Sequence, residues 1–389
     1  MSPVEVPLLV VGGGIGGLAT ALSAARHGLP VHVLERSPEF GEIGAGLQMG
    51  PNASRALDAL GVLDDVLPLA VRPGAAVLRD ALSGRRLTRL DLGPAFRGRF
   101  GYPYLVMHRS DLLDVLLKHC EANDLITLEA GRDVVSSEVG DDRADVRCTD
   151  GTTYRTRTLV AADGLRSGLR RHLSDDEPVC SGYAAYRGTA PRADDASDDV
   201  VLWIGPGLHL VRYPVRAGAL VNQVAVFRSP RFHAGEAEWG GVDELDAAFA
   251  GTCGPVRDAV ALVGRDRHWA IHDREPLDTW VRGRLVLVGD AAHPMLQYLG
   301  QGACQALEDA VELGGRLADD EAGALEAFQR ARHPKAVRCQ TSARPWGDLW
   351  HTADPLTVAV RDRMFALRAD DDYSELDWLY GVSPGGRRR

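Results

Sequence analysis

The sequence predicts an α/β fold in which a parallel, Rossmann-like sheet binds a dinucleotide and a mainly antiparallel sheet is inserted. Short apolar runs without a polar break, typical of buried parallel strands, occur at 7–11, 31–34, 159–162 and 284–288. The segment 178–276 instead alternates apolar and polar residues and is rich in aromatic residues, as antiparallel strands are. Helical spacing returns after it, over 303–317, 325–352 and 355–368.

The first apolar run leads directly into Gly-x-Gly-x-x-Gly at Gly12, Gly14 and Gly17. In a dinucleotide-binding turn the first glycine permits the tight turn, the second lets the backbone approach a pyrophosphate, and the third lets helix and strand pack closely. A helix over 18–27 and a second strand follow, and Glu35 stands where an acid would bind a ribose. An ordinary glycine-rich turn is the alternative, but the complete order favours a dinucleotide, either FAD or NAD.

Two later turns have the same setting. Asp163-Gly164 follows the strand at 159–162, and Gly289-Asp290 follows the strand at 284–288. A helix opens after Gly300 and Gly302, and helix N-termini at the carboxyl ends of parallel strands are favoured places for anionic ligands. Taken alone, Asp163-Gly164 could be an ordinary turn that precedes a capped helix. We expect His293 to support the second turn rather than to act as a base.

Composition narrows the class of protein. A chain of 389 residues with 45% hydrophobic content can hold two or three domains, or one with a large insertion. The net charge of −10 argues against nucleic acid as a partner. The six cysteines lack the short spacings of a metal site, so we expect reduced thiols, no metal and a cytoplasmic location. No apolar run is long enough to cross a membrane, and no signal peptide is expected.

Two segments near the first turn carry further candidates. The loop at 37–52 is rich in glycine and is expected to cover a cofactor, with a plain surface loop as the alternative. Asn52 is the expected cap of a helix over 53–60. Ser110 or Asp111 is expected to cap the next helix, which would place Arg109 just ahead of its positive end, where an anion is favoured. Arg109 could equally be a surface ion-pair partner.

The strand at 208–213 carries candidate pocket residues. His209, Val211 and Tyr213 share one face because side chains alternate along a strand. A lone histidine on a strand is more often structural, and Tyr213 could simply end the strand inside the core. Arg187 and Arg212 could pair with a substrate carboxylate or with surface acids.

The order and separations of the three turns resemble the single-component FAD-dependent aromatic hydroxylases over nearly the whole chain. The resemblance implies bound FAD, NADH as co-substrate with NADPH as the alternative, and O₂. It also implies hydroxylation of a small phenolic acid through a flavin C4a-hydroperoxide. By motif it assigns the cofactor to Gly12, Gly14, Ile15, Gly17, Glu35, Arg36, Gln48, Arg109, Asp163, Gly289, Asp290, Gly300, Gly302 and Ala303.

Gln297 and the segments 181–189, 222–227 and 273–276 are similar to the branch of this family that converts 3-hydroxybenzoate to gentisate, hydroxylating para to the phenol. That similarity implies a catalytic role for His209, which would accept or share the phenol proton, and for Tyr213 and Gln297, which would hold the substrate. Met295 and Gln301 depart from the branch. Salicylate 1-hydroxylation, 6-hydroxynicotinate 3-monooxygenation and an inactive FAD-binding regulatory protein stay open as alternatives.

We therefore expect an FAD-binding segment at 1–177 that includes a β-meander, a substrate-binding sheet at 178–276, a return to the FAD-binding domain at 277–352, and a helical segment with a tail at 353–389. Trp346 and Trp350 would either form a homodimer face or cover the FAD-binding domain.

Overall fold

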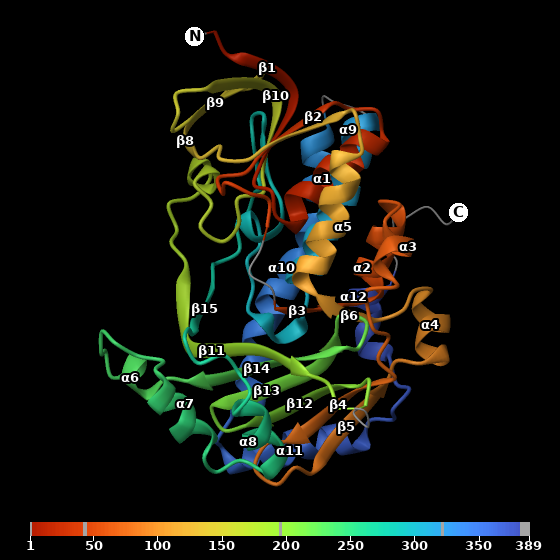
Figure 1. The fold of residues 1–389 in the computed structure, drawn as a ribbon, viewed down its shortest axis with the longest axis vertical. Helices are drawn as coiled ribbons and strands as arrows, with labels where there is room; N and C mark the ends of the chain where they lie inside the picture. Colours follow the sequence, from red (N-terminus) through yellow and green to blue (C-terminus); the bar gives the residue numbers. More distant parts are fainter. Residues whose placement is uncertain (1, 42–44, 194–196, 320–322, 382–389) are drawn as a thin grey trace.

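The structure is a computed structural model that describes residues 2–41, 45–193, 197–319 and 323–381. It has two parts, each built around one large sheet, and the long helix α10 (Ala324–His351) passes from one to the other (Figure 1). The tail expected after the last helix lies outside the described residues, as do 42–44 of the expected cofactor-covering loop.

The upper part in Figure 1 contains the eight-stranded sheet, with the order β16-β17-β10-β1-β2-β7 and β8 and β9 attached beside β10. The pairs of β1 with β2 and β10, of β2 with β7, and of β10 with β17 are parallel, as the unbroken apolar runs predict. The strands are β1 (Val4–Val11), β2 (Val31–Leu34), β7 (Ile126–Glu129), β8 (Val134–Val139), β9 (Ala144–Cys148), β10 (Thr153–Ala161), β16 (Val281–Arg282) and β17 (Leu285–Leu287).

Three helices pack together beside this sheet: α1 (Ile15–Arg26), α5 (Arg109–Glu121) and α9 (Gly302–Asp319). α1 is rich in alanine and leucine and is buried along nearly its whole length between the other two. Gly28 adopts a φ of 81° just past its end, a conformation that costs glycine little and stops the helix. The Gly-x-Gly-x-x-Gly turn is therefore fixed at the junction of β1 and α1.

The lower part contains the seven-stranded sheet, ordered β15-β11-β14-β13-β12-β4-β5. Its β11–β15, β11–β14, β13–β14 and β12–β13 pairs are antiparallel, as the alternating pattern predicts. The strands are β4 (Ala75–Asp80), β5 (Arg86–Asp91), β11 (Val179–Pro191), β12 (Val200–Gly205), β13 (Leu208–Val215), β14 (Leu220–Arg228) and β15 (Trp269–Asp273).

The second sheet extends beyond the segment 178–276. β4 and β5 come from the segment that the sequence places with the FAD-binding domain, and β4 pairs in parallel with β12. This pairing gives β12 a partner on the edge that β13 leaves open. The local sequence pattern of 75–91 does not predict that β4 and β5 join this sheet. β3 (Gly46–Met49) and β6 (Leu105–His108) form a small ribbon between the two large sheets.

The remaining helices cover the sheets and the ends of the pocket. On the far face of the second sheet, α7 and α8 pack against Trp203, Leu210 and Phe227. The helices are α2 (Pro51–Ala59), α3 (Leu63–Val66), α4 (Pro94–Phe100), α6 (Pro230–His233), α7 (Val242–Phe249), α8 (Gly254–Val260), α11 (Pro355–Leu367) and α12 (Asp377–Tyr380), with short 3₁₀ turns η1 (Leu169–His172), η2 (Gly289–Ala291), η3 (Gln297–Leu299) and η4 (Ser374–Leu376).

Two expected helix caps are wrong. α2 begins at Pro51 behind Gly50, so Asn52 lies inside its first turn and its amide donates to the side chains of Gln301 and Glu308. α5 begins at Arg109, so Ser110 and Asp111 lie inside the helix and neither is the cap. Proline is favoured at the first helical position, which explains the earlier start of α2.

The expected capped helix after Asp163-Gly164 is also absent from this described stretch, where only the short 3₁₀ turn η1 forms. The carboxylate of Asp163 accepts from the backbone N–H groups of Gly168 (2.9 Å) and Leu169 (3.4 Å), so it closes a loop rather than a longer helix.

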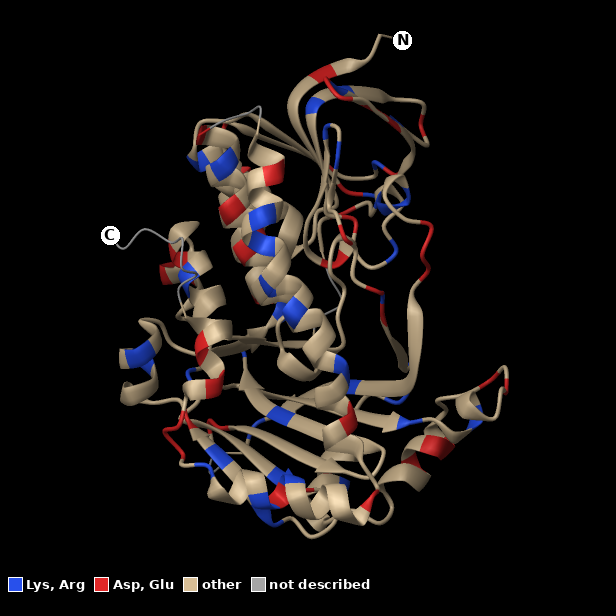
Figure 2. Ribbon diagram, turned by 180° about the vertical axis from the view of Figure 1, so that it is seen from behind, with Lys and Arg blue, Asp and Glu red and all other residues tan. Residues whose placement is uncertain are grey.

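Charged side chains of both signs are interspersed along both parts (Figure 2). None of the helices within the described ranges is long and apolar enough to cross a membrane. The six cysteines are free, and the described residues contain no group of three or more His, Cys, Asp or Glu side chains that could hold a metal ion.

Candidate cofactor and substrate site

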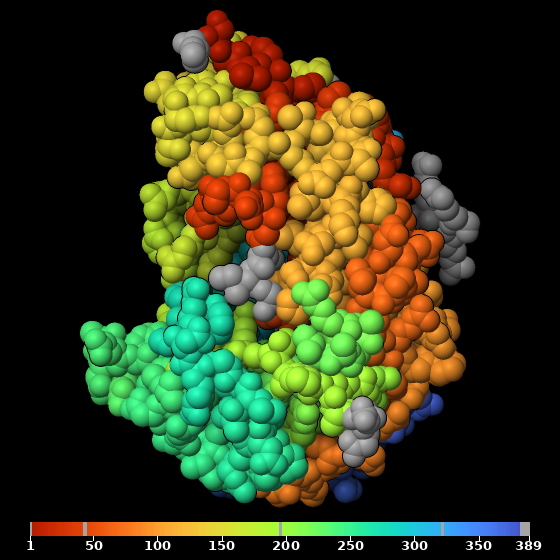
Figure 3. Space-filling model, viewed as in Figure 1, coloured from red at the N-terminus to blue at the C-terminus, as the bar shows by residue number. Residues whose placement is uncertain are grey.

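A large pocket of about 1590 Å³ runs from the Gly-x-Gly-x-x-Gly turn to the inner face of the second sheet. The surface in Figure 3 is hollowed between the red and yellow segments of the upper part and the teal and green segments of the lower part. Every residue that the sequence assigned to the cofactor lines this pocket except Gly17, and all three expected catalytic residues line it as well.

The glycines of the first turn differ in what they permit. Gly12 has a φ of 111°, and a Cβ there would overlap the carbonyl oxygen of Ala162. A Cβ at Gly17 would overlap the carbonyl oxygen of Gly12, so Gly17 serves the packing of helix on strand. A Cβ at Gly14 would meet no atom within 4 Å, because this glycine faces the open pocket. The turn thus presents bare backbone to whatever occupies the pocket.

The Glu35 carboxylate stands at the end of β2 beside this turn. It accepts from the backbone N–H groups of Gly13 and Ser37, both at 2.8 Å. An ionised carboxylate has about four acceptor sites, so two are left for ribose hydroxyls. Arg36 follows it and also lines the pocket.

The Gly289-Asp290 turn is held from behind by a buried carboxylate. Gly289 adopts a φ of 57°, and its N–H donates to Asp309 of α9 at 3.0 Å. The same carboxylate pairs with His293 at 2.6 Å and with Arg332 of α10 at 2.8 Å, and the Asp309 and His293 side chains are fully buried. His293 therefore supports the turn, as expected, and Asp290 is left exposed toward the pocket.

Burial alone would raise the pKa of Asp309, but electrostatic interactions with His293 and Arg332 outweigh it. Together with the hydrogen bonds from His293 and Gly289 they lower the pKa to about 2. At Asp163, by contrast, burial dominates over the hydrogen bonds and raises the pKa of the carboxyl group.

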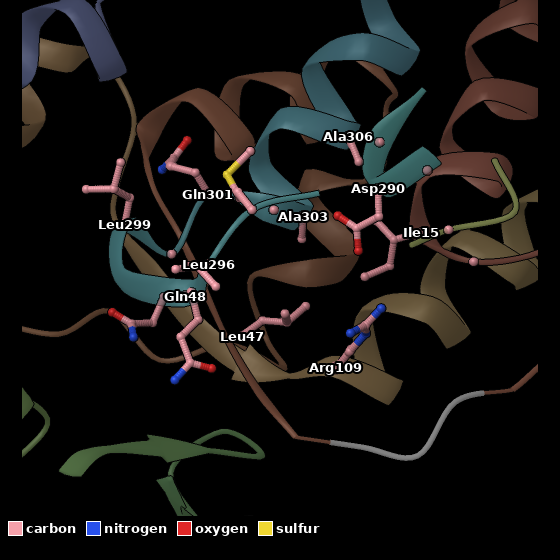
Figure 4. A pocket seen from close by; sticks show the side chains of 18 of the residues that line it. Ile15, Leu47, Gln48, Arg109, Asp290, Leu296, Leu299, Gln301, Ala303 and Ala306 are labelled. Atoms are coloured by element: carbon pink, nitrogen blue, oxygen red, sulfur yellow. The ribbon is translucent and has the colours of Figure 1, made fainter. Parts of the chain in front are cut away.

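In Figure 4, Arg109 lies below Asp290 and Ile15, all three at the same end of the pocket. Arg109 is the first residue of α5, and its backbone N–H donates to the carbonyl of Ala45 at 2.8 Å. A cation and a helix N-terminus at one place favour a bound phosphate.

Gln48, Leu47 and Leu296 lie farther along the pocket, toward the second sheet (Figure 4). The Gln48 side-chain oxygen accepts from the hydroxyl of Tyr104 at 2.8 Å, which fixes the amide orientation. Gly300 has a φ of 60°, and Gly302 and Ala303 open α9. Met295 and Gln301, the two positions that depart from the resembled branch, also line the pocket.

The expected catalytic residues meet at the lower end of the pocket. His209 and Tyr213 are 2% and 3% exposed and lie on the inner face of β13. Gln297 approaches from η3, with its side-chain nitrogen 3.4 Å from Nε2 of His209. Burial lowers the pKa of His209 well below its usual value, and the nearby His351 adds to this effect. Burial raises the pKa of Tyr213, against the charge of Arg187.

The walls around these three residues are mainly apolar: Leu202, Val211, Val224 and Leu296 line them. Arg187 of β11 brings a positive charge to this end and lies 5.3 Å from the ring centroid of Trp269. Arg212 does not line the pocket, because it lies on the opposite face of β13 from His209 and Tyr213.

Several residues in or behind the pocket wall were not predicted from the sequence. Tyr104, which lines the pocket, and Asp309, which lies behind the Gly289-Asp290 turn, carry no local motif, and His351 lies 142 residues from the histidine that it contacts. Trp350 is 6% exposed and lines the pocket with the more exposed Trp346, so these two rings close the pocket from α10. A tryptophan and histidine pair at the end of a long helix was the available signal for His351.

These observations fit FAD. Its ADP half suits three features of the first turn. These are the tight backbone at Gly12, where a Cβ would overlap Ala162, the open backbone at Gly14, and the two acceptor sites left on Glu35. The pocket then continues toward the second sheet past Gln48, as the rest of a long dinucleotide requires.

Comparison with known proteins gives a consistent result. The model of the FAD binding domain family matches residues 5–339. The chain is 37% identical to the 3-hydroxybenzoate 6-hydroxylase of Polaromonas naphthalenivorans (strain CJ2), over 99% of this chain and 98% of that protein. It is 38% identical to the 3-hydroxybenzoate 6-hydroxylase of Klebsiella oxytoca, over 96% of each. A variant of Klebsiella pneumoniae HpxO complexed with FAD has a TM-score of 0.86 and 28% identity, over 98% of this chain and 100% of that chain.

We predict that Asp309→Asn lowers the free energy of unfolding of the apoprotein at pH 7 by about 3 kcal/mol, because Arg332 loses a buried counter-charge. Since the folded pKa lies below the unfolded value, the carboxylate stabilises the fold above about pH 4 and this contribution is lost as the pH falls toward 2. Urea unfolding at several pH values should therefore show a shallower acid loss in the variant.

Asp290→Asn is the matched control, since its carboxylate is exposed in the same turn and its loss should leave the unfolding free energy nearly unchanged. Equal stability of Asp309→Asn and the unmodified protein at pH 7 would contradict the assigned role of the buried carboxylate.

Proposed function

This chain belongs to the FAD binding domain family, and on that premise we propose that it hydroxylates 3-hydroxybenzoate para to its hydroxyl group, giving gentisate, with NADH and O₂ as co-substrates. Two relatives that are 37% and 38% identical to this chain are named 3-hydroxybenzoate 6-hydroxylases, and these names supply the substrate. NADH follows from the family resemblance of the sequence.

One observation carries the proposal. His209, Tyr213 and Gln297 come from β13 and η3, which belong to different parts of the fold, and line the same apolar end of one pocket. A pocket of this kind, apolar with a few convergent polar groups, suits an aromatic ring that carries two polar substituents.

Bound FAD would supply the two-electron chemistry and the activation of O₂. The chain itself binds, orients and deprotonates the substrate. His209 is neutral at neutral pH because of its burial, so one ring nitrogen offers a lone pair to the phenol proton. Loss of that proton makes the ring electron-rich at the position para to the oxygen, which is where an electrophilic oxygen attacks.

Gln297 and Tyr213 hold the ring in place. The amide of Gln297 faces Nε2 of His209, so a phenol oxygen that lies beside this pair can contact both groups. The high pKa of Tyr213 keeps its hydroxyl protonated, which makes it a hydrogen-bond donor toward the substrate. The apolar walls and the rings of Trp350 and Tyr298 exclude water from this end.

The proposed activity can be measured directly. The FAD-loaded protein under air should oxidise NADH faster when 3-hydroxybenzoate is added, and chromatography should detect gentisate in near-equal amount to the NADH lost. Salicylate giving catechol instead would overturn the substrate assignment and leave the reaction class. If no phenolic acid stimulates NADH loss by the loaded protein, the substrate class is wrong.

Substitution of His209 tests its role as the base. His209→Ala should lower kcat for hydroxylation by about 10²-fold, since general base catalysis typically contributes this much or more, while FAD content is unchanged. His268→Ala is the control, because His268 lies outside the pocket lining, against Tyr186 and Trp239. A variant at 209 with unchanged kcat would remove the proposed role of this residue.

Substitution of Arg187 tests whether it binds the substrate carboxylate. Arg187→Met should raise KM for 3-hydroxybenzoate by about 10-fold and change KM for NADH little, because a charge-assisted hydrogen bond to the carboxylate is lost. Arg212→Met removes an arginine of β13 that does not line the pocket and should leave both KM values unchanged. Equal effects of the two substitutions on the aromatic substrate would argue that Arg187 does not bind it.

A further inference from the structure

His209 does not stand alone in the pocket wall. Its Nδ1 is 2.8 Å from Nε2 of His351, the last residue of α10, and the two rings meet edge to edge with centroids 5.0 Å apart and planes 14° from parallel. His351 is 7% exposed. The two imidazoles therefore form a hydrogen-bonded pair that is fixed in orientation.

The other side of His351 faces a different space. A second cleft of about 250 Å³ is lined by His351 but not by His209, whereas the main pocket is lined by His209 but not by His351. Leu296 and Tyr298 line both spaces and form the wall between them. The histidine pair thus spans the wall from one space to the other.

The second cleft reaches solvent. Asp348 is exposed, and the Glu275 side chain is 65% exposed. Around His351 the charged or titratable neighbours in the cleft are Tyr183 of β11, Asp273 at the end of β15, Glu275 beyond it, Tyr298 of η3, and Arg344 and Asp348 of α10. Asp273 and Glu275 are paired with Arg344.

The Nδ1 atom of His351 is buried and has no hydrogen-bond partner among the residues that the structure describes. Its Nε2 is already engaged by His209, so Nδ1 is the ring atom left to exchange a proton with the cleft. Stacking on Tyr183, with centroids 4.7 Å apart, holds the ring in this position.

We propose that His351 is a positioning residue that acts through His209, as the outer half of a two-histidine path that carries the substrate's phenol proton from the apolar end of the main pocket to the second cleft. The inference rests on the proposed function, since it needs a substrate hydroxyl beside Nε2 of His209.

The path has a physical reason. Burial lowers the pKa of His351 to about 3 and that of His209 well below its usual value, so neither ring holds a positive charge readily. A proton taken from the substrate must therefore move on. Passing it to water in the cleft avoids a buried imidazolium at either ring.

Each step exchanges one bond to hydrogen for another. The phenol O–H bond breaks as its proton bonds to Nε2 of His209, while the Nδ1 proton of His209 moves to Nε2 of His351. The Nδ1 proton of His351 then bonds to water in the cleft. No electron is transferred, and both rings stay neutral with their tautomers exchanged. The reverse sequence returns a proton to the product oxygen and restores the starting tautomers.

The test uses His351→Ala in the FAD-loaded protein, with added imidazole as the probe. The substitution opens the wall between the second cleft and Nδ1 of His209, so imidazole can take the vacated place. We expect kcat for gentisate formation to fall by about 10²-fold with KM for 3-hydroxybenzoate changed little, and imidazole to restore kcat in proportion to its neutral form.

His351→Phe is the second variant, because it keeps the stacked ring and fills the space. It should lose kcat similarly and should not respond to imidazole. His268→Ala should show neither change. Wild-type kcat in either His351 variant, or loss in His351→Ala that imidazole does not restore, would overturn the path. Should His351→Ala fail to retain FAD, the kcat of His351→Phe decides alone. If the unmodified protein forms no gentisate, the proposed function fails instead.

Discussion

The buried carboxylate of Asp309 holds together the parts of the protein that matter most for function. It binds the backbone of the Gly289 turn, the ring of His293 and the guanidinium of Arg332, and so joins the edge of the first sheet to α9 and α10. A carboxylate without such partners would be costly to bury. From Arg332 to its end at His351, α10 rises about 28 Å away from this anchor. Its last turn supplies Trp350 to the far end of the pocket and His351 to the second cleft behind the wall.

The contact between the two parts is equally close at β3. The backbone N–H of Gly46 donates to the side-chain oxygen of Asn222 at 2.9 Å, and a Cβ at Gly46 would overlap the ring of Tyr213. The strand that carries Gln48 therefore lies directly against β13 and β14, which carry Tyr213 and Asn222. Gly347 of α10 makes a similar close approach, because a side chain there would overlap the ring of Tyr298. The absence of a side chain at Gly46 and at Gly347 lets β3 and α10 approach the rings of Tyr213 and Tyr298 closely.

The sequence predicted the features that depend on local chemistry. Gly12 has the turn conformation and Gly17 the close helix-to-strand approach that the motif requires, and the two-residue period of β13 placed His209 and Tyr213 on one face. It did not predict the joining of β4 to β12, the supporting role of Asp309 or the contact of His351, because each depends on pairing between distant segments. The helix caps at Asn52, Ser110 and Asp111 were wrong because Pro51 and Arg109 begin their helices earlier than polar side chains suggested.

The Glu35 carboxylate is already held in a fixed position before a nucleotide binds. Its two hydrogen bonds to the backbone of Gly13 and Ser37 lock the side chain in one rotamer and tie the first turn to the end of β2. Ordering a free glutamate side chain on binding would oppose association by roughly 0.5–1.5 kcal/mol. That entropy is already lost in the folded apoprotein. The acid therefore favours tight retention of a cofactor that stays bound through many turnovers, at the expense of the stability of the empty chain.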